Sequence, residues 1–216
     1  MKNAKIFGIG SAGSQIVNKL PFPLPRAVLD TCLPVIQLME CEKYLCGKLT
    51  TRHMGCGGSI GRGYASAVET LADKLSLFDN RVNIFVCGLG GGTSGMIEYI
   101  LEHKKQLPHN KYNILVCTYP LGKERNRVNS AEYLMRRLSM YADLVVIIKL
   151  DEIRIKMKHS EKNVHLIFSD VPTQMNYYLG LLIRNDETSL RQYLKRHKKH
   201  NIVKFMIMGC KLRNPY

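Results

Sequence analysis

Short apolar runs alternate along the chain with segments of helical periodicity. The runs that are typical of buried strands are nearly continuous in apolar residues and lie at 83–87, 111–119 and 143–148. The segments that space apolar residues three and four apart, as amphipathic helices do, lie at 64–77, 96–101 and 127–141. Strands that alternate with helices predict an α/β fold with a doubly wound, mostly parallel sheet and helices on both faces.

The two ends of the chain extend this pattern. Residues 5–7 are expected to form a strand followed by a helix over 14–20, and residues 202–208 a last strand. A basic helix is predicted at 189–200, and 163–168 fits either a short strand or the start of a longer helix. The segment 33–44 is ambiguous. Neither a linker nor an internal repeat separates these elements, so residues 1–216 are expected to form one domain.

Three glycine-rich segments each follow an apolar run or loop and lead into a predicted helix. We call them the first loop (8–13), the second loop (55–63) and the third loop (88–95). Glycine holds five of the eight positions of the third loop, more than a tight turn requires. Successive glycines let backbone N–H groups converge ahead of a helix N-terminus, which is a favourable place for a phosphate.

The first loop alone supports another interpretation. Gly8, Gly10 and Gly13 have the Gly-x-Gly-x-x-Gly spacing of a dinucleotide fingerprint, and Asp30 lies about twenty residues further on, where an acid that binds ribose belongs. An NAD-type oxidoreductase is therefore an alternative hypothesis. It leaves the second and third loops unexplained.

The net charge of +15 on 216 residues indicates an anionic partner, such as nucleic acid or an anionic membrane surface. Lys and Arg are densest at 154–162 and 191–204, in the C-terminal third. A second alternative is therefore a basic module that binds nucleic acid or another anion and has degenerate nucleotide loops. For helix 64–77, the predicted apolar face consists of Ala65, Val68, Leu71, Ala72 and Leu75.

No apolar run approaches eighteen residues, and the N-terminal strand turns into glycine too early for a signal peptide. We therefore expect a cytoplasmic protein. The seven cysteines include no Cys-x-x-Cys pair, so we expect reduced thiols and no metal held by protein ligands alone.

Taken together, the three loops resemble those of the tubulin/FtsZ superfamily of GTP-binding cytoskeletal proteins. Residues 8–20 are similar to the family's first phosphate loop and helix, residues 55–62 resemble its γ-phosphate-sensing loop, and residues 90–95 resemble its glycine-rich signature. The order and spacing of all three fit. The resemblance implies a Rossmann-like nucleotide-binding domain whose backbone amides hold GTP or GDP with Mg²⁺.

The resemblance also implies roles for individual residues. Those expected near the α and β phosphates are Gly10, Ser11, Ala12 and Gln15. Those expected near the γ phosphate are Gly55, Cys56, Gly57 and Gly58. The main cradle would consist of Gly90, Gly91, Gly92, Thr93 and Ser94. On the sugar side the family has a proline, a ribose-binding glutamate and an arginine, matched by Pro120, Glu124 and Arg127.

The chain departs from the family pattern in several places. The third loop is one residue shorter than the signature, and Lys149-Leu150-Asp151 stands where the family has an asparagine near the sugar and base. Candidates for reading the base are Phe168, Asp170, Asn176 and Tyr177. Asp186 and Glu187 are the candidate catalytic acids, which in the family polarise water for a neighbouring subunit.

From this resemblance we expect a divergent, short member that lacks the family's second domain. It would bind guanine nucleotide, hydrolyse GTP slowly or only with a partner, and act in filament assembly, its regulation or cell division. Self-association or a FtsZ-like filament would provide that partner. Because FtsZ-like proteins are usually acidic, the positive charge also points to an additional anionic partner.

Overall fold

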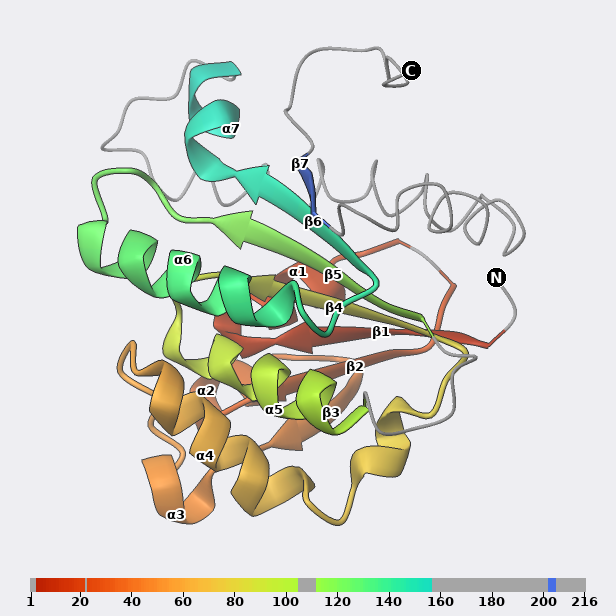
Figure 1. The fold of residues 1–216 in the computed structure, drawn as a ribbon. Coiled ribbons are helices and arrows are strands. Elements are labelled where there is room, and N and C mark those ends of the chain that lie inside the picture. The colour runs from red at the N-terminus through yellow and green to blue at the C-terminus, as the bar shows by residue number, and fades with distance from the viewer. Residues whose placement is uncertain (1–2, 22, 105–111, 157–201, 205–216) are drawn as a thin grey trace.

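The computed structural model describes residues 3–21, 23–104, 112–156 and 202–204. Within them seven strands form one sheet in the order β3-β2-β1-β4-β5-β6-β7, and each neighbouring pair is parallel (Figure 1). The strands are β1 (Ala4–Ile9), β2 (Arg26–Asp30), β3 (Glu42–Leu45), β4 (Val82–Gly88), β5 (Tyr112–Tyr119), β6 (Leu144–Lys149) and β7 (Ile202–Lys204).

Helices cover both faces of this sheet. The helices are α1 (Gly10–Asn18), α2 (Leu33–Gln37), α3 (Lys48–Thr51), α4 (Ile60–Leu71), α5 (Gly95–Lys104), α6 (Arg125–Leu138) and α7 (Leu150–Lys156). Apolar residues of α1, α2 and α7 join one buried cluster, and those of α4, α5 and α6 join the other. In Figure 1, α4, α5 and α6 lie together on one face of the sheet. Each central strand contributes side chains alternately to the two clusters, as the period of two requires. The predicted doubly wound parallel α/β fold is confirmed.

The strand order reverses at the centre of the sheet. The chain builds β1, β2 and β3 outward in one direction, and β4 then returns to pair with the free side of β1. In open parallel sheets, ligands bind beyond the carboxyl ends of the strands at such a reversal. The loops that follow β1 and β4 are the first and third glycine loops, so the topology places both at this position.

The predicted buried face of the helix at 64–77 is confirmed at Leu71, and Leu75 packs against the core, but the prediction is wrong for Ala65, Val68 and Ala72. The helix begins earlier and ends at Leu71, with a 3-10 turn at Leu75–Phe78 after it. Its buried residues are Gly63, Ser66, Ala67 and Leu71, while Val68 is 43% exposed. The reason is close backbone packing, because a Cβ added to Gly63 would lie 2.1 Å from the carbonyl oxygen of Gly92. Small residues therefore face inward, and Ala65 and Ala72 face solvent.

The ambiguous segment at 33–44 contains α2 and the start of the edge strand β3. The short helix α3 was not predicted. Of the last predicted strand only Ile202–Lys204 is described, and the elements predicted at 163–168 and 189–200 lie outside the described residues. Among the residues that are described, no helix has the length and apolar character needed to cross a membrane.

Candidate functional site

The residues predicted to bind a ligand come from five segments at the carboxyl edge of the sheet. Gly10 to Gln15 begin α1 directly after β1, and Gly55 to Gly58 precede α4. The third loop joins β4 to α5 through a 3-10 turn, Gly92–Ser94, and Pro120 and Glu124 lie between β5 and α6. Arg127 lies in the first turn of α6. The third loop is the element around which the others gather.

The first and third loops meet at Gly10 and Thr93. Gly10 has a φ of +71°, and a Cβ built on it would lie 3.1 Å from the Cβ of Thr93. The left-handed backbone and this close approach both require glycine. The start of α1 is therefore held directly against the third loop.

The second and third loops meet at Cys56 and Gly92. A Cβ on Gly92 would lie 2.6 Å from the Cβ of Cys56 and 2.7 Å from the backbone nitrogen of Ser59. Ser59 is the N-cap of α4, and its hydroxyl accepts a hydrogen bond from the backbone nitrogen of Arg62 at 3.4 Å. The third loop therefore packs, backbone to backbone, on the N-terminus of α4.

The segment after β5 meets the third loop at Gly90. This glycine has a φ of +81°, and a Cβ built on it would lie 2.3 Å from the carbonyl oxygen of Arg127. The three contacts bring the residues predicted from the family resemblance into one place, with the exception of those outside the described residues.

The second loop also has an open side. Gly55, Gly57 and Gly58 have φ values of +85°, +56° and +80°. A Cβ on Gly58 would meet no atom within 4 Å, and one on Gly57 would meet only Arg62 Nη1 at 3.9 Å. These two glycines therefore adopt a left-handed backbone beside solvent, and no neighbouring atom among the described residues would clash with a side chain there.

Thr31, directly after β2, is a site residue that the sequence analysis missed. Its Oγ1 lies 3.1 Å from Thr93 Oγ1 and 3.3 Å from Cys56 Sγ, and its carbonyl oxygen accepts a hydrogen bond from the backbone nitrogen of Gly55 at 3.0 Å. Thr31 therefore links the second and third loops. The signal that could have found it is a polar residue directly after a buried strand next to the strand that carries the first loop.

Asp30, the last residue of β2, has both carboxylate oxygens engaged within the protein. Ser11 Oγ donates to Oδ2 at 3.0 Å, and the backbone nitrogens of Thr31 and Cys32 donate to Oδ1 at 2.7 and 3.2 Å. Burial raises the pKa of this carboxyl, and the three hydrogen bonds act in the opposite direction. The side chain is fully buried, so its geometry does not fit the dinucleotide alternative, in which Asp30 must reach a ribose hydroxyl.

The residues predicted on the sugar side contact one another. Glu124 Oε2 accepts a hydrogen bond from the backbone nitrogen of Leu121 at 3.2 Å, and Oε1 forms an ion pair with Arg127 Nη1 at 3.0 Å. Pro120 is buried. Asp151, in the tripeptide that replaces the family's asparagine, accepts from the backbone nitrogen of Gly122 at 2.8 Å and so fixes the same loop.

The side chains of the remaining predicted residues differ in accessibility. Ser11 and Gln15 are exposed on α1, and Ala12 is half-buried. The hydroxyl of Ser94 is turned inward and donates to the carbonyl oxygen of Gly91 at 2.5 Å, and its backbone nitrogen donates to the same oxygen at 3.1 Å, so both donors of Ser94 are engaged within the third loop. Asn176, Asp186 and Glu187 lie outside the described residues, as do Phe168, Asp170, Tyr177 and most of the basic segments.

The donor set fits phosphate better than a metal held by the protein alone. The described residues contain no group of three or more His, Cys, Asp or Glu side chains that could hold a metal ion. What they offer is glycine backbone at the N-termini of α1 and α4, with one carboxyl group and several hydroxyls beside it. A Mg²⁺ ion here would take most of its ligands from nucleotide phosphates and water.

The six described cysteines are free thiols, as predicted. Burial raises the pKa of Cys46 and of Cys87 to about 12, so both stay protonated near neutral pH.

The fold and site define a class: a parallel α/β chain with three glycine-rich loops that converge beside the reversal of its strand order. No family model matches the sequence. The chain is 30% identical over 156 residues to cell division protein FtsZ 1 of Pyrococcus abyssi, an alignment that covers 68% of this chain and 41% of that protein. The chain therefore spans about two fifths of the length of this relative.

Solved structures of the same type superpose on the chain. An empty FtsZ dimer of Methanocaldococcus jannaschii matches with a TM-score of 0.79 at 22% identity, covering 88% of this chain and 60% of that one. A GTPγS-bound protofilament of CetZ2 from Haloferax volcanii matches with a TM-score of 0.77 at 18% identity, covering 88% and 62%. The chain is thus FtsZ-like in sequence and has the tubulin/FtsZ-like fold.

Proposed function

We propose that this chain binds GTP or GDP with Mg²⁺ at the carboxyl edge of its sheet and works as a FtsZ-like protein in filament assembly or cell division. The observation that carries the proposal is the convergence of the three loops, in which Gly92 approaches Cys56 too closely for any side chain and Gly10, on left-handed backbone, lies tightly against Thr93. Loops that only reversed the chain direction would have no need to meet.

The binding step follows from the arrangement of these loops. The N-termini of α1 and α4 supply positive dipole ends, and the glycines of the second and third loops supply backbone N–H groups without side chains in the way. The Thr93 hydroxyl stands between them and is half-buried. We assign the phosphates to this position and the sugar to the side of Glu124 and Arg127.

Hydrolysis and assembly belong to the same proposal. Mg²⁺, when bound with the nucleotide, neutralises charge that develops on the phosphates. The proposed catalytic acids Asp186 and Glu187 would act on the nucleotide of a neighbouring copy, which makes the GTPase slow in isolated chains. The assembly part of the proposal is supported by a solved neighbour, because the CetZ2 structure is a GTPγS-bound protofilament.

The first test is a thermal-shift or calorimetric titration of the purified protein with GTP, ATP and NAD, each with and without Mg²⁺. A ligand that binds only the folded state stabilises it by RT ln(1 + [L]/Kd), so 100 Kd of ligand should add about 2.7 kcal/mol. We expect a GTP-selective shift that depends on Mg²⁺. The absence of any nucleotide shift would overturn the proposal and leave the basic surface as the leading account of function.

A second test uses the open side of the second loop. The Gly57→Ala methyl would meet only Arg62 Nη1 at 3.9 Å, so the protein should tolerate it apart from about 1 kcal/mol of backbone strain. If a phosphate occupies that open side, the affinity for GTP should fall about tenfold or more. The control is Gly61→Ala, whose methyl also enters open space but on helical backbone. Equal affinity in the two variants would contradict the assignment of the γ phosphate to the second loop.

A further inference from the structure

Three groups that each carry one polar hydrogen form a closed triangle where the loops meet. Thr31 Oγ1 lies 3.1 Å from Thr93 Oγ1 and 3.3 Å from Cys56 Sγ, and Thr93 Oγ1 lies 3.7 Å from Cys56 Sγ. The geometry has Thr93 donating to the sulfur. The consistent circuit is then Thr93 to Cys56, Cys56 to Thr31, and Thr31 to Thr93.

The closed circuit determines how many hydroxyl hydrogens remain available to a ligand. Each member donates once and accepts once, so a complete circuit leaves no hydroxyl hydrogen for a ligand. Ionised phosphate oxygens only accept hydrogen bonds. Thr31 is fully buried and Cys56 is 3% exposed, whereas Thr93 is half-buried. Thr93 is therefore the member that can turn its hydrogen toward a ligand, and it must leave the sulfur to do so.

The chemical identity of residue 56 sets the free-energy cost of releasing the Thr93 hydroxyl from the circuit. A thiol is a weak hydrogen-bond acceptor and donor, and a hydroxyl in its place would be stronger. Breaking the contact between Thr93 and sulfur therefore costs less than breaking one between two hydroxyls. After release Thr93 still accepts from Thr31, which keeps its oxygen in place.

We propose that Cys56 is a positioning residue that holds the Thr93 hydroxyl in a closed circuit with Thr31 and releases it, at low cost, to a phosphate-bearing ligand. This inference rests on the proposed function, because it concerns the same nucleotide site. In the proposed function the second loop binds phosphate through its backbone. The inference adds a separate role for the side chains of Cys56 and Thr31.

The test is a substitution series at Cys56, with GTP plus Mg²⁺ and inorganic pyrophosphate as probes in calorimetric titrations. Cys56→Ser replaces the sulfur with a stronger donor and acceptor, and once the loop has shifted to match the shorter C–O bond the circuit is stronger, so affinity should fall about threefold to fivefold. Cys56→Ala removes the partner that holds Thr93, so affinity should equal or exceed that of the wild type. A purely structural role predicts the reverse order, because serine is closer to cysteine in shape than alanine is. Tighter binding by Cys56→Ser than by Cys56→Ala would overturn the inference.

The matched control is the same pair of substitutions in a Thr93→Val background. Valine has the shape of threonine without the hydroxyl, so the difference in affinity between Cys56→Ser and Cys56→Ala should disappear. A difference that persists shows that Cys56 acts by another route and overturns the inference.

A measurement without ligand separates this inference from the proposed function. In urea unfolding of the free protein, Cys56→Ser should raise the midpoint, and the gain should vanish in the Thr93→Val background. If the wild type bound neither GTP nor pyrophosphate, the proposed function would be refuted. The energetic coupling between Cys56 and Thr93 in urea unfolding would still show whether the circuit exists. The absence of coupling would overturn the circuit whatever the nucleotide result.

Discussion

The two edges of the sheet are built in opposite ways. At the carboxyl edge, glycine loops approach one another through their backbones and leave an open side at Gly57 and Gly58. At the amino edge, side-chain amides satisfy one another: Asn83 is 1% exposed and donates to the carbonyl oxygen of Phe78 at 2.8 Å and to Asn113 Oδ1 at 3.1 Å. The first arrangement leaves hydrogen-bonding capacity for a ligand, and the second uses it for the fold.

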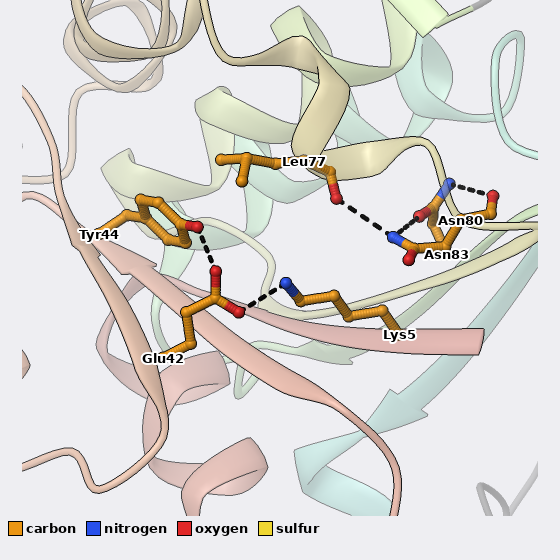
Figure 2. Close-up of polar contacts among 6 residues, drawn as sticks. All are labelled: Lys5, Glu42, Tyr44, Leu77, Asn80 and Asn83. Carbon is orange, nitrogen blue, oxygen red and sulfur yellow. Dashed lines mark hydrogen bonds and ion pairs between the residues drawn. The ribbon is translucent and has the colours of Figure 1, made fainter. Parts of the chain in front are cut away.

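Figure 2 shows the hydrogen bonds and the ion pair that connect side chains at the amino edge. Asn80 Nδ2 donates to Asn83 Oδ1 at 3.1 Å, and Lys5 Nζ pairs with Glu42 Oε2 at 2.6 Å while Glu42 also accepts from the hydroxyl of Tyr44. The Lys5 and Glu42 pair connects β1 with β3 across β2. Substitutions at the amino edge should therefore lower stability without changing ligand binding, whereas those at the carboxyl edge should affect binding.

The largest expected effect is that of Gly92→Ala at the carboxyl edge. Its Cβ would lie 2.6 Å from the Cβ of Cys56 and 2.9 Å from the backbone of Gly58, so the second and third loops must separate. We expect a loss of about 3 kcal/mol of stability and no saturable response to GTP, measured by urea unfolding and thermal shift. Gly91→Ala is the stability control, because its Cβ would meet only the carbonyl oxygen of Gly88 at 3.5 Å. If both variants unfolded alike, the close approach of the loops would be refuted.

Asn83→Ala should have the next largest effect, at the amino edge. It leaves the carbonyl oxygen of Phe78 and Asn113 Oδ1 without the donor that they share in a buried place, which costs about 2 kcal/mol in urea unfolding. The affinity for GTP should not change, because Asn83 lies at the far edge of the sheet. Asn126→Ala, on the exposed face of α6, should change neither quantity. An altered GTP affinity in Asn83→Ala would contradict the division of labour between the edges.

The smallest effect concerns pH and compares one carboxyl at each edge. Burial raises the pKa of Asp30 and of Asp143 above the ordinary value of 3.8. A raised pKa in the folded state stabilises the fold below pH 3.8, and that stabilisation is lost as pH rises through the folded pKa. Asp30→Asn and Asp143→Asn should therefore both gain stability relative to the wild type as pH rises from 3 toward neutrality, roughly by tenths to 1 kcal/mol.

The two variants should differ in binding. Asn at position 30 presents an amide hydrogen to Ser11 Oγ, so the hydrogen of that hydroxyl is freed and the affinity for GTP changes. Asp143 accepts from the backbone nitrogen of Asn113 at 2.7 Å, far from the loops, and its variant should bind as the wild type does. Unfolding curves over the pH range, with titrations at pH 7, decide both points. Stability profiles that run parallel to the wild type would refute the proposed ionisation.

Much of the carboxyl edge could be predicted from the sequence, because its elements have strong local signals. Apolar runs identified β4, β5 and β6, and glycine spacing identified all three loops. What could not be predicted is which atoms meet. The hydrophobic period follows the apolar character of side chains and contains no signal for a backbone contact. It therefore predicts a buried Val68, whereas the contact of α4 with the third loop places Gly63 inside.

Thr31 and Asp30 show the same difference between local signal and tertiary contact. The spacing of about twenty residues from the first loop predicts Asp30 as a ribose ligand in the dinucleotide alternative. In the structure its carboxylate is held by Ser11 and by the turn after β2. Thr31 belongs to no sequence motif. It lies beside the second and third loops only because β2 pairs with β1.

The backbone contacts at Gly13, Gly63 and Gly95 have a consequence for how such chains change over generations. A Cβ at any of these three positions would lie 2.1 Å from a carbonyl oxygen, so the fold itself forbids substitution whether or not a ligand is bound. Gly57 and Gly58 have no such neighbours. A descendant that abandoned its ligand would keep the first set, whereas at Gly57 and Gly58 only the strain of a left-handed backbone would oppose a side chain, so these two positions should change first.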